Sequence, residues 1–123
     1  MEGLRGGISI KILLISTAAL PTPPVEYGGM EWVVYDLAVS LMLKGHKVSV
    51  AAAQGSKFPD GIELIETVKQ GQYGFMEKEA LRAYQSRLDE FDIIHDNSHF
   101  KLVFSLFRGY ENKYNYLSTL HTT

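Results

Sequence analysis

Two glycines just before an apolar helical pattern are the first residues in this sequence that suggest chemistry. Gly28 and Gly29 follow a proline-rich loop, and from Met30 onward apolar residues recur at helical spacing as far as a Lys44-Gly45 stop. Glycine lets the backbone approach a ligand without a Cβ in the way, and the N–H groups at a helix N-terminus favour an anion. Gly28, Gly29 and Met30 are therefore candidate phosphate-facing amides. A surface loop that merely ends in two glycines is the alternative reading.

Polar residues at strand ends form the second group of candidates. His95 ends the fourth predicted strand, Asp96 and Asn97 lie in the turn directly after it, His99 follows closely, and His121 ends the last strand. In an open parallel sheet the ligand crevice lies outside the carboxyl ends of the strands, so the two glycines, His95, Asn97 and His121 are expected around one mouth. For His95 an ordinary structural hydrogen bond is the simpler interpretation. His95 and His99 have the spacing of metal ligands, but no third ligand is evident, and no metal site is expected.

The elements that position these residues alternate between strands and helices. Apolar runs predict strands over residues 10–16, 46–53, 62–68, 92–95 and 116–121, with the third near a sheet edge. Helical spacing predicts helices over residues 30–44 and 100–108, and one whose apolar face carries Leu81, Tyr84, Leu88 and Phe91. Charged residues of that helix, Arg87 and Glu90 among them, are interpreted as a solvated face. The order indicates an α/β fold, a Rossmann-like parallel sheet with helices on both faces.

Composition excludes several classes of protein. A chain of 123 residues forms one domain at most, and 46% hydrophobic content is enough for a core. The formal net charge is −2 without long runs of like charge, so a nucleic-acid partner is not expected. The absence of cysteine excludes disulfides and thiolate metal sites and fits a cytoplasmic location. Residues 1–9 are expected to be a flexible leader, and Lys11 argues against a signal peptide over residues 8–20.

Five blocks of the sequence resemble the N-terminal half of family 4 glycosyltransferases. The combination of Tyr-Gly-Gly-x-Glu at a helix start, Gly-His-x-Val and a later Leu-His is specific to that resemblance. In the order of the family, the blocks are Lys11–Ser16 with the proline loop, Tyr27–Ala38, Lys44–Val50, Phe91–Asp96 and Ser118–Thr122.

The resemblance implies a GT-B enzyme, in which two Rossmann-like domains face each other across a cleft. Such an enzyme transfers a sugar from a nucleotide diphosphate donor with retention and without a metal ion or other cofactor. Residues 10–123 would be its N-terminal, acceptor-side domain. Carried over by motif, Gly28, Gly29 and Met30 belong to the loop that approaches the donor diphosphate, and His121 is the catalytic residue beside the transferred sugar. The candidate acceptor or cleft contacts are Tyr27, His95, Asn97, His99 and Thr122.

Two departures from the family pattern limit what the resemblance implies. Asn97 stands where relatives often carry a second histidine, which excludes a His-His pair at that place. Residues 10–123 are too few to include also the family's C-terminal domain, which holds most donor contacts, so this N-terminal half is expected to be inactive alone. The expected partners are that domain, a nucleotide sugar and a sugar or lipid acceptor. A homodimer through exposed apolar surface and peripheral membrane contact are left open.

Two other function classes stay open beside the transferase. One is a non-catalytic α/β module that binds a nucleotide, a phosphorylated ligand or a protein partner at the glycine loop. The other is a flavodoxin-like or dehydrogenase-like domain. The sequence disfavours the latter because the first strand is not followed by Gly-x-Gly-x-x-Gly and no Walker lysine is present.

Overall fold

A computed structural model of the chain describes residues 8–17, 22–23, 29–68, 75–98 and 115–118, with residues 75–77 as backbone only. The predicted helix over residues 100–108, the end of the predicted strand over residues 116–121 and residues 1–7 of the predicted leader lie outside them. In chain order the elements are β1 (Lys11–Ile15), α1 (Gly29–Leu43), β2 (Lys47–Ala52), β3 (Ile62–Glu66), α2 (Phe75–Tyr84), the 3-10 helix η2 (Gln85–Glu90), β4 (Ile93–Asp96) and β5 (Tyr116–Ser118).

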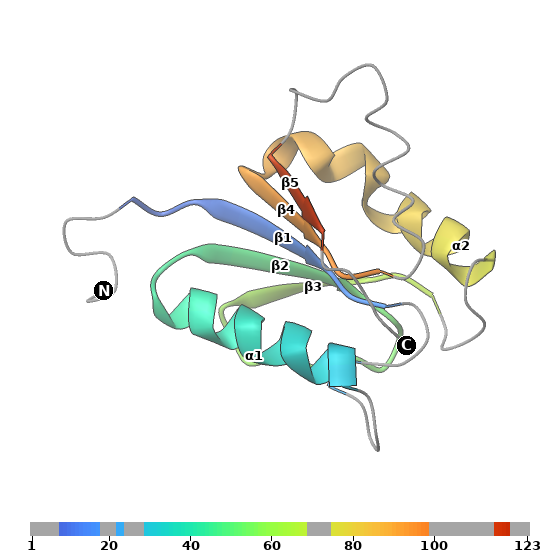
Figure 1. Cartoon of the computed structure of the whole chain (residues 1–123), viewed down its shortest axis with the longest axis horizontal. Helices are drawn as coiled ribbons and strands as arrows, with labels where there is room; N and C mark the ends of the chain where they lie inside the picture. The colour runs from blue at the N-terminus through green and yellow to red at the C-terminus, as the bar shows by residue number, and fades with distance from the viewer. Residues whose placement is uncertain (1–7, 18–21, 24–28, 69–74, 99–114, 119–123) are drawn as a thin grey trace.

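The described strands form one parallel sheet in the order β3-β2-β1-β4-β5 (Figure 1). β1 lies in the middle, which agrees with its nearly continuous apolar sequence, since a central parallel strand is covered on both faces. β3 lies at an edge, as its weaker alternation predicts. The strand order reverses between β1 and β4, because the chain leaves β1 toward β2 on one side and returns to pair β4 on the other.

Helices cover both faces of the sheet, so the predicted α/β, Rossmann-like fold class is confirmed (Figure 1). Leu14 of β1 packs in a buried cluster with Val34 and Ala38 of α1. The neighbouring residue Leu13 points to the opposite face and belongs to a second buried cluster with Leu88 of η2. Successive side chains of a strand alternate between faces, and this alternation gives the sheet two apolar surfaces to cover.

The C-terminus of α1 ends at the predicted glycine stop. Gly45 has a φ of 95°, a left-handed conformation that favours glycine because it has no Cβ. Its N–H donates to the carbonyl of Met42 at 2.9 Å, and the N–H of His46 donates to the carbonyl of Leu41 at 3.2 Å. These two bonds form a Schellman motif, which satisfies the last helical carbonyls and turns the chain into β2.

The second helical segment differs from its prediction in two respects. The α-helix ends at Tyr84 and continues as the 3-10 helix η2, although the predicted apolar residues do pack on one face of the sheet. The interpretation of all its charges as a solvated face is wrong for Arg87. The Arg87 guanidinium donates to Glu90 at 3.0 and 2.9 Å and to Glu63 of β3 at 3.0 and 3.0 Å. We call Arg87, Glu63 and Glu90 the Arg87 cluster, and it joins η2 to the edge strand.

The Arg87 cluster makes the stability of the domain depend on pH. Hydrogen bonds from Arg87 and then from Ser49 hold the pKa of the Glu63 carboxyl below its ordinary value of 4.5. A carboxyl whose pKa is lowered by folding stabilises the fold above its ordinary pKa, and this contribution is lost as the pH falls through the lowered value. The Glu63 side chain is 49% exposed, so solvent screening keeps the contribution small.

We expect Arg87→Gln to lower the free energy of unfolding by roughly 0.5–1 kcal/mol at neutral pH, and the difference to vanish in acid as Glu63 protonates. Urea denaturation of both proteins from neutral pH down to about pH 3 measures this. Arg82→Gln is the matched control, because Arg82 is 76% exposed and contacts only Glu79 at 3.6 Å among the described ion pairs. A difference between Arg87→Gln and wild type that stays constant over this range would contradict the expectation.

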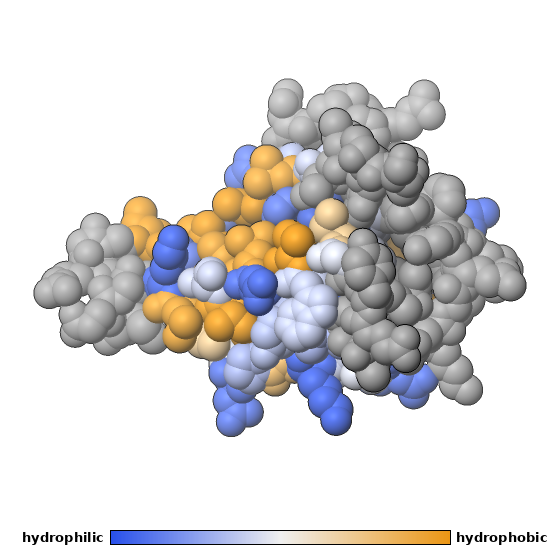
Figure 2. Space-filling view, turned by 60° about the horizontal axis from the view of Figure 1, so that its bottom comes forward, coloured by the Kyte–Doolittle hydropathy of each residue, from blue (hydrophilic) through white to orange (hydrophobic). Residues whose placement is uncertain are grey.

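Exposed apolar side chains gather on the side of the molecule where α1 lies. Seen from this side, apolar residues form a broad patch (Figure 2). Large apolar residues that remain exposed include Trp32, Val33 and Leu43 of α1 and Leu117 of β5. Trp32 also packs edge-on against Tyr35, which stacks on Phe58. The helix thus carries apolar residues on its outer face as well as on the face that covers the sheet.

Candidate functional site

The candidate site lies at the carboxyl edge of the sheet, where the strand order reverses between β1 and β4. The N–H of Asn97, just after β4, donates to the carbonyl of Ile15 at the end of β1 at 2.8 Å. The N-terminus of α1 lies above the same edge, because Glu31 in its first turn contacts Thr17, which follows β1. Open parallel sheets bind ligands at this kind of switch point. Two strand ends and a helix N-terminus therefore meet here.

The first turn of α1 carries a buried carboxylate. Glu31 is 5% exposed, and its Oε2 accepts a hydrogen bond from the hydroxyl of Thr17, which is 3% exposed. A carboxylate in the first turn offsets part of the positive charge at the N-terminus of a helix. The Gly29 and Met30 amides beside it can therefore offer an anion hydrogen bonds, but little net positive charge.

A cluster of buried hydroxyls fastens the loop after β1 to the connection between β2 and β3. Thr22 is fully buried, and its Oγ1 lies 2.7 Å from the Oγ of Ser16. The Thr22 N–H donates to the Oγ of Ser56 at 2.8 Å, and the Thr22 carbonyl accepts from the Lys57 N–H at 3.0 Å. Ser56 in turn donates to the carbonyl of Ala53 at 2.6 Å. These bonds fix the start of the loop that leads to the glycines.

A buried aspartate joins the end of β4 to the start of β5 on the opposite face of the sheet. Asp96 is fully buried and accepts hydrogen bonds from the Tyr116 hydroxyl at 2.6 Å and the Ser98 N–H at 2.8 Å. Burial, followed by the hydrogen bond to Asp96 and its negative charge, raises the pKa of Tyr116 well above its ordinary value. Tyr116 therefore stays neutral near neutral pH and remains a donor. This contact holds the residues after β4 next to β5.

The structure places four of the sequence-predicted site residues. Gly29 and Met30 begin α1, and His95 lies in β4 in register with Leu14, on the face covered by α1. Asn97 is 1% exposed, and its side-chain amide lies 3.5 Å from the carbonyl of His95. These four residues lie at the carboxyl edge. The other predicted site residues lie outside the described residues: Tyr27, Gly28, His99, His121 and Thr122.

Sequence reasoning missed the buried polar residues that shape this edge. Thr17, Thr22 and Ser56 carry no motif, although small polar residues directly after apolar strands are a signal that a loop needs internal hydrogen bonds. Asp96 was expected in the turn after the fourth strand, whereas it ends β4 and is buried. The sequence signal for Asp96 is its position directly after a buried apolar strand, because a buried carboxylate needs hydrogen-bond donors.

The described residues contain neither a metal-binding group nor a membrane-spanning helix. No group of three or more histidine, aspartate or glutamate side chains in the described ranges is arranged to hold a metal ion. Within the same ranges, no helix has the length and apolar character needed to cross a membrane.

A family of known proteins matches most of the chain. The model of a family described as Glycosyltransferase Family 4 matches residues 27–123, which include the glycine pair, α1, the whole described sheet after β1 and the predicted Leu-His block. No curated protein matches the chain. The family model covers well over half of the sequence, and the chain therefore belongs to glycosyltransferase family 4.

Proposed function

We propose that this domain forms the acceptor side of a glycosyltransferase that moves a sugar from a nucleotide diphosphate donor to a sugar or lipid acceptor, without a metal ion. The observation that carries the proposal is the family match over residues 27–123, together with the position of the helix N-terminus and two strand ends at one edge. Reaction within a cleft needs a second wall, and the proposal assigns this wall to a C-terminal domain.

The proposed donor contact is the loop that enters α1. The backbone amides of Gly28, Gly29 and Met30 would donate hydrogen bonds to the diphosphate. The first N–H groups of a helix can bind an anion without the help of a side chain. Glu31 already compensates part of the helix dipole there. Metal-free departure of a nucleotide diphosphate also needs cations. The proposal therefore places those cations in the C-terminal domain, which makes this domain inactive alone.

The proposed acceptor side is the part of the edge that follows β4 and β5. His95 and Asn97 are the proposed contacts of this group that the structure describes, and the Asn97 N–H donates to the carbonyl of Ile15 at the end of β1. Tyr27, His99 and Thr122 are the further proposed cleft contacts. His121 is proposed to lie beside the transferred sugar, where a histidine can hydrogen-bond a hydroxyl or help to stabilise developing charge.

We expect His121→Ala in the complete two-domain enzyme to lower kcat by about a hundredfold while the fold is retained, because a group that stabilises the transition state is lost. Initial rates of sugar transfer, with circular dichroism of both proteins, measure this. His46→Gln is the matched control, since the Nδ1 of His46 accepts a hydrogen bond from the Ile10 N–H at 3.3 Å, at the opposite edge of the sheet. Wild-type turnover in His121→Ala would remove His121 from the site.

A further inference from the structure

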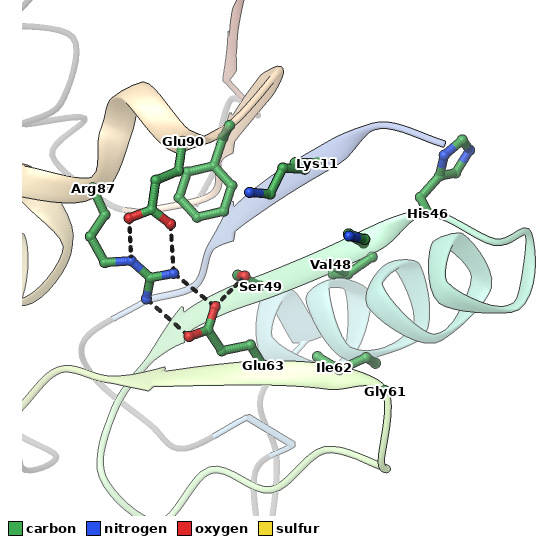
Figure 3. Close-up of a pocket in the computed structure, with 11 residues that line it drawn as sticks. Lys11, His46, Val48, Ser49, Gly61, Ile62, Glu63, Arg87 and Glu90 are labelled. Carbon is green, nitrogen blue, oxygen red and sulfur yellow. Dashed lines mark hydrogen bonds and ion pairs between the residues drawn. The ribbon is translucent and has the colours of Figure 1, made fainter. Parts of the chain in front are cut away.

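A second concave site lies at the amino ends of β1, β2 and β3, at the opposite edge from the candidate site. It is a pocket of about 490 Å³ on the face that carries η2 (Figure 3). Lys11, Lys47, Ser49 and Glu63 come from the sheet, and the Arg87 side chain comes from η2. Polar side chains thus replace the apolar ones that cover the rest of this face of the sheet.

Two lysines stand side by side in this pocket. Lys11 and Lys47 are register partners on neighbouring strands, and both are exposed. Parallel partners share a face, and like charges directly opposite each other are destabilising. Among the described residues no carboxylate forms an ion pair with either ammonium group. An anion between them would relieve their repulsion.

The carboxylates of the pocket are already engaged by arginine. The guanidinium of Arg87 lies between Glu63 and Glu90 and donates two hydrogen bonds to each (Figure 3). The Arg87 cluster carries one negative charge overall, and the two lysines give the pocket a net positive charge. A carboxylate can accept about four hydrogen bonds, so Glu90 keeps acceptor capacity for hydroxyl donors. The pocket therefore presents cations and hydroxyl acceptors close to one another.

We propose that this pocket binds a phosphorylated sugar or polyol, with its phosphate between Lys11 and Lys47 and its hydroxyls on the oxygens of Glu63 and Glu90. Lysine binds phosphate as a point charge, and carboxylates accept hydrogen bonds from hydroxyls. Lys11 reaches across the pocket toward the Arg87 cluster, so the two kinds of group are close enough for one small molecule (Figure 3). The site lies away from the carboxyl edge and does not depend on the proposed transferase reaction.

An amide NMR titration of the full chain with inorganic phosphate, glucose 6-phosphate and glucose, at constant ionic strength, tests this. We expect both phosphates to shift the amides of Lys47, Ser49 and Glu63, glucose 6-phosphate to bind more tightly than phosphate, and glucose to bind least. The double variant Lys11→Gln/Lys47→Gln should weaken phosphate binding at least tenfold, and the exposed Lys78→Gln should leave it unchanged.

Four outcomes would overturn the proposal. The first is the absence of shifts at the amino edge up to about 10 mM ligand, a concentration at which even weak binding is visible. The second is equal affinity in the wild type and the double lysine variant, and the third is equal binding of glucose and glucose 6-phosphate. Shifts confined to Asn97 and Ser98 also overturn it, because they would place the phosphate at the carboxyl edge instead.

Discussion

Asp96→Ala is expected to lower the free energy of unfolding by about 2–4 kcal/mol. Asp96 is fully buried, and its two oxygens accept hydrogen bonds from the Tyr116 hydroxyl at 2.6 Å and the Ser98 N–H at 2.8 Å. Alanine removes both acceptors at once. A buried donor that loses its acceptor cannot regain the hydrogen bond that water gave it in the unfolded chain, and this cost adds to the lost bond.

Urea denaturation followed by circular dichroism measures the effect of Asp96→Ala. Tyr116→Phe is the matched control, since it removes the hydroxyl and leaves the carboxylate bonded to Ser98, so about 1 kcal/mol is expected. The ranking of the two variants follows from the number of hydrogen bonds that each one removes. An Asp96→Ala protein as stable as wild type would show that this contact does not hold β5 to the sheet.

Leu14→Ala is expected to lower the free energy of unfolding by about 3 kcal/mol, within the range seen for buried leucines. Leu14 is fully buried in the middle strand, in the cluster with Val34 and Ala38 of α1 and Val50 of β2. Removing three carbon atoms there loses apolar burial and leaves a cavity that a rigid sheet cannot close. The loss should reduce the packing of α1 on the sheet.

Leu43→Ala supplies the control for Leu14→Ala, because the same atoms are removed from a side chain that is 66% exposed. We expect a change within about 0.5 kcal/mol for this surface position. Denaturation midpoints and slopes for both variants distinguish lost stability from a change in unfolded-state compactness. Equal losses in the two variants would mean that α1 does not pack on the sheet through Leu14.

Most of the fold can be predicted from the sequence, because buried apolar residues recur with the period of the helix or strand that carries them. β1 was predicted from its continuous apolar run, and α1 from apolar residues three and four apart that end at Gly45. The change from α2 to η2 at Gln85 could not be predicted, since the spacing of Tyr84, Leu88 and Phe91 fits an α-helix, in which residues three and four apart share a face. The spacing of apolar residues predicts which face of a helical segment is buried more reliably than it predicts the number of residues per turn.

The candidate site could be predicted only in outline. Strand direction alone places Gly29, His95 and Asn97 at one edge, so their common location follows from the sequence. The bond between Thr17 and Glu31 joins residues 14 apart in the chain, and the bond between Thr22 and Ser56 joins residues 34 apart. Such pairs depend on the paths of loops, which no repeating pattern records. The role of Arg87 was misread for the same reason, because its partner Glu63 belongs to another element.

The hydroxyl cluster around Thr22 also determines which parts of the domain are interchangeable. Ser56 lies in the connection between β2 and β3, and its Oγ accepts the Thr22 N–H at 2.8 Å. A relative with a shorter β2–β3 connection would lack the Ser56 hydroxyl that accepts the Thr22 N–H. The proline loop would then lose this attachment. The two loops therefore behave as one module, so that a new loop transplanted after β1 should bring its own β2–β3 connection with it.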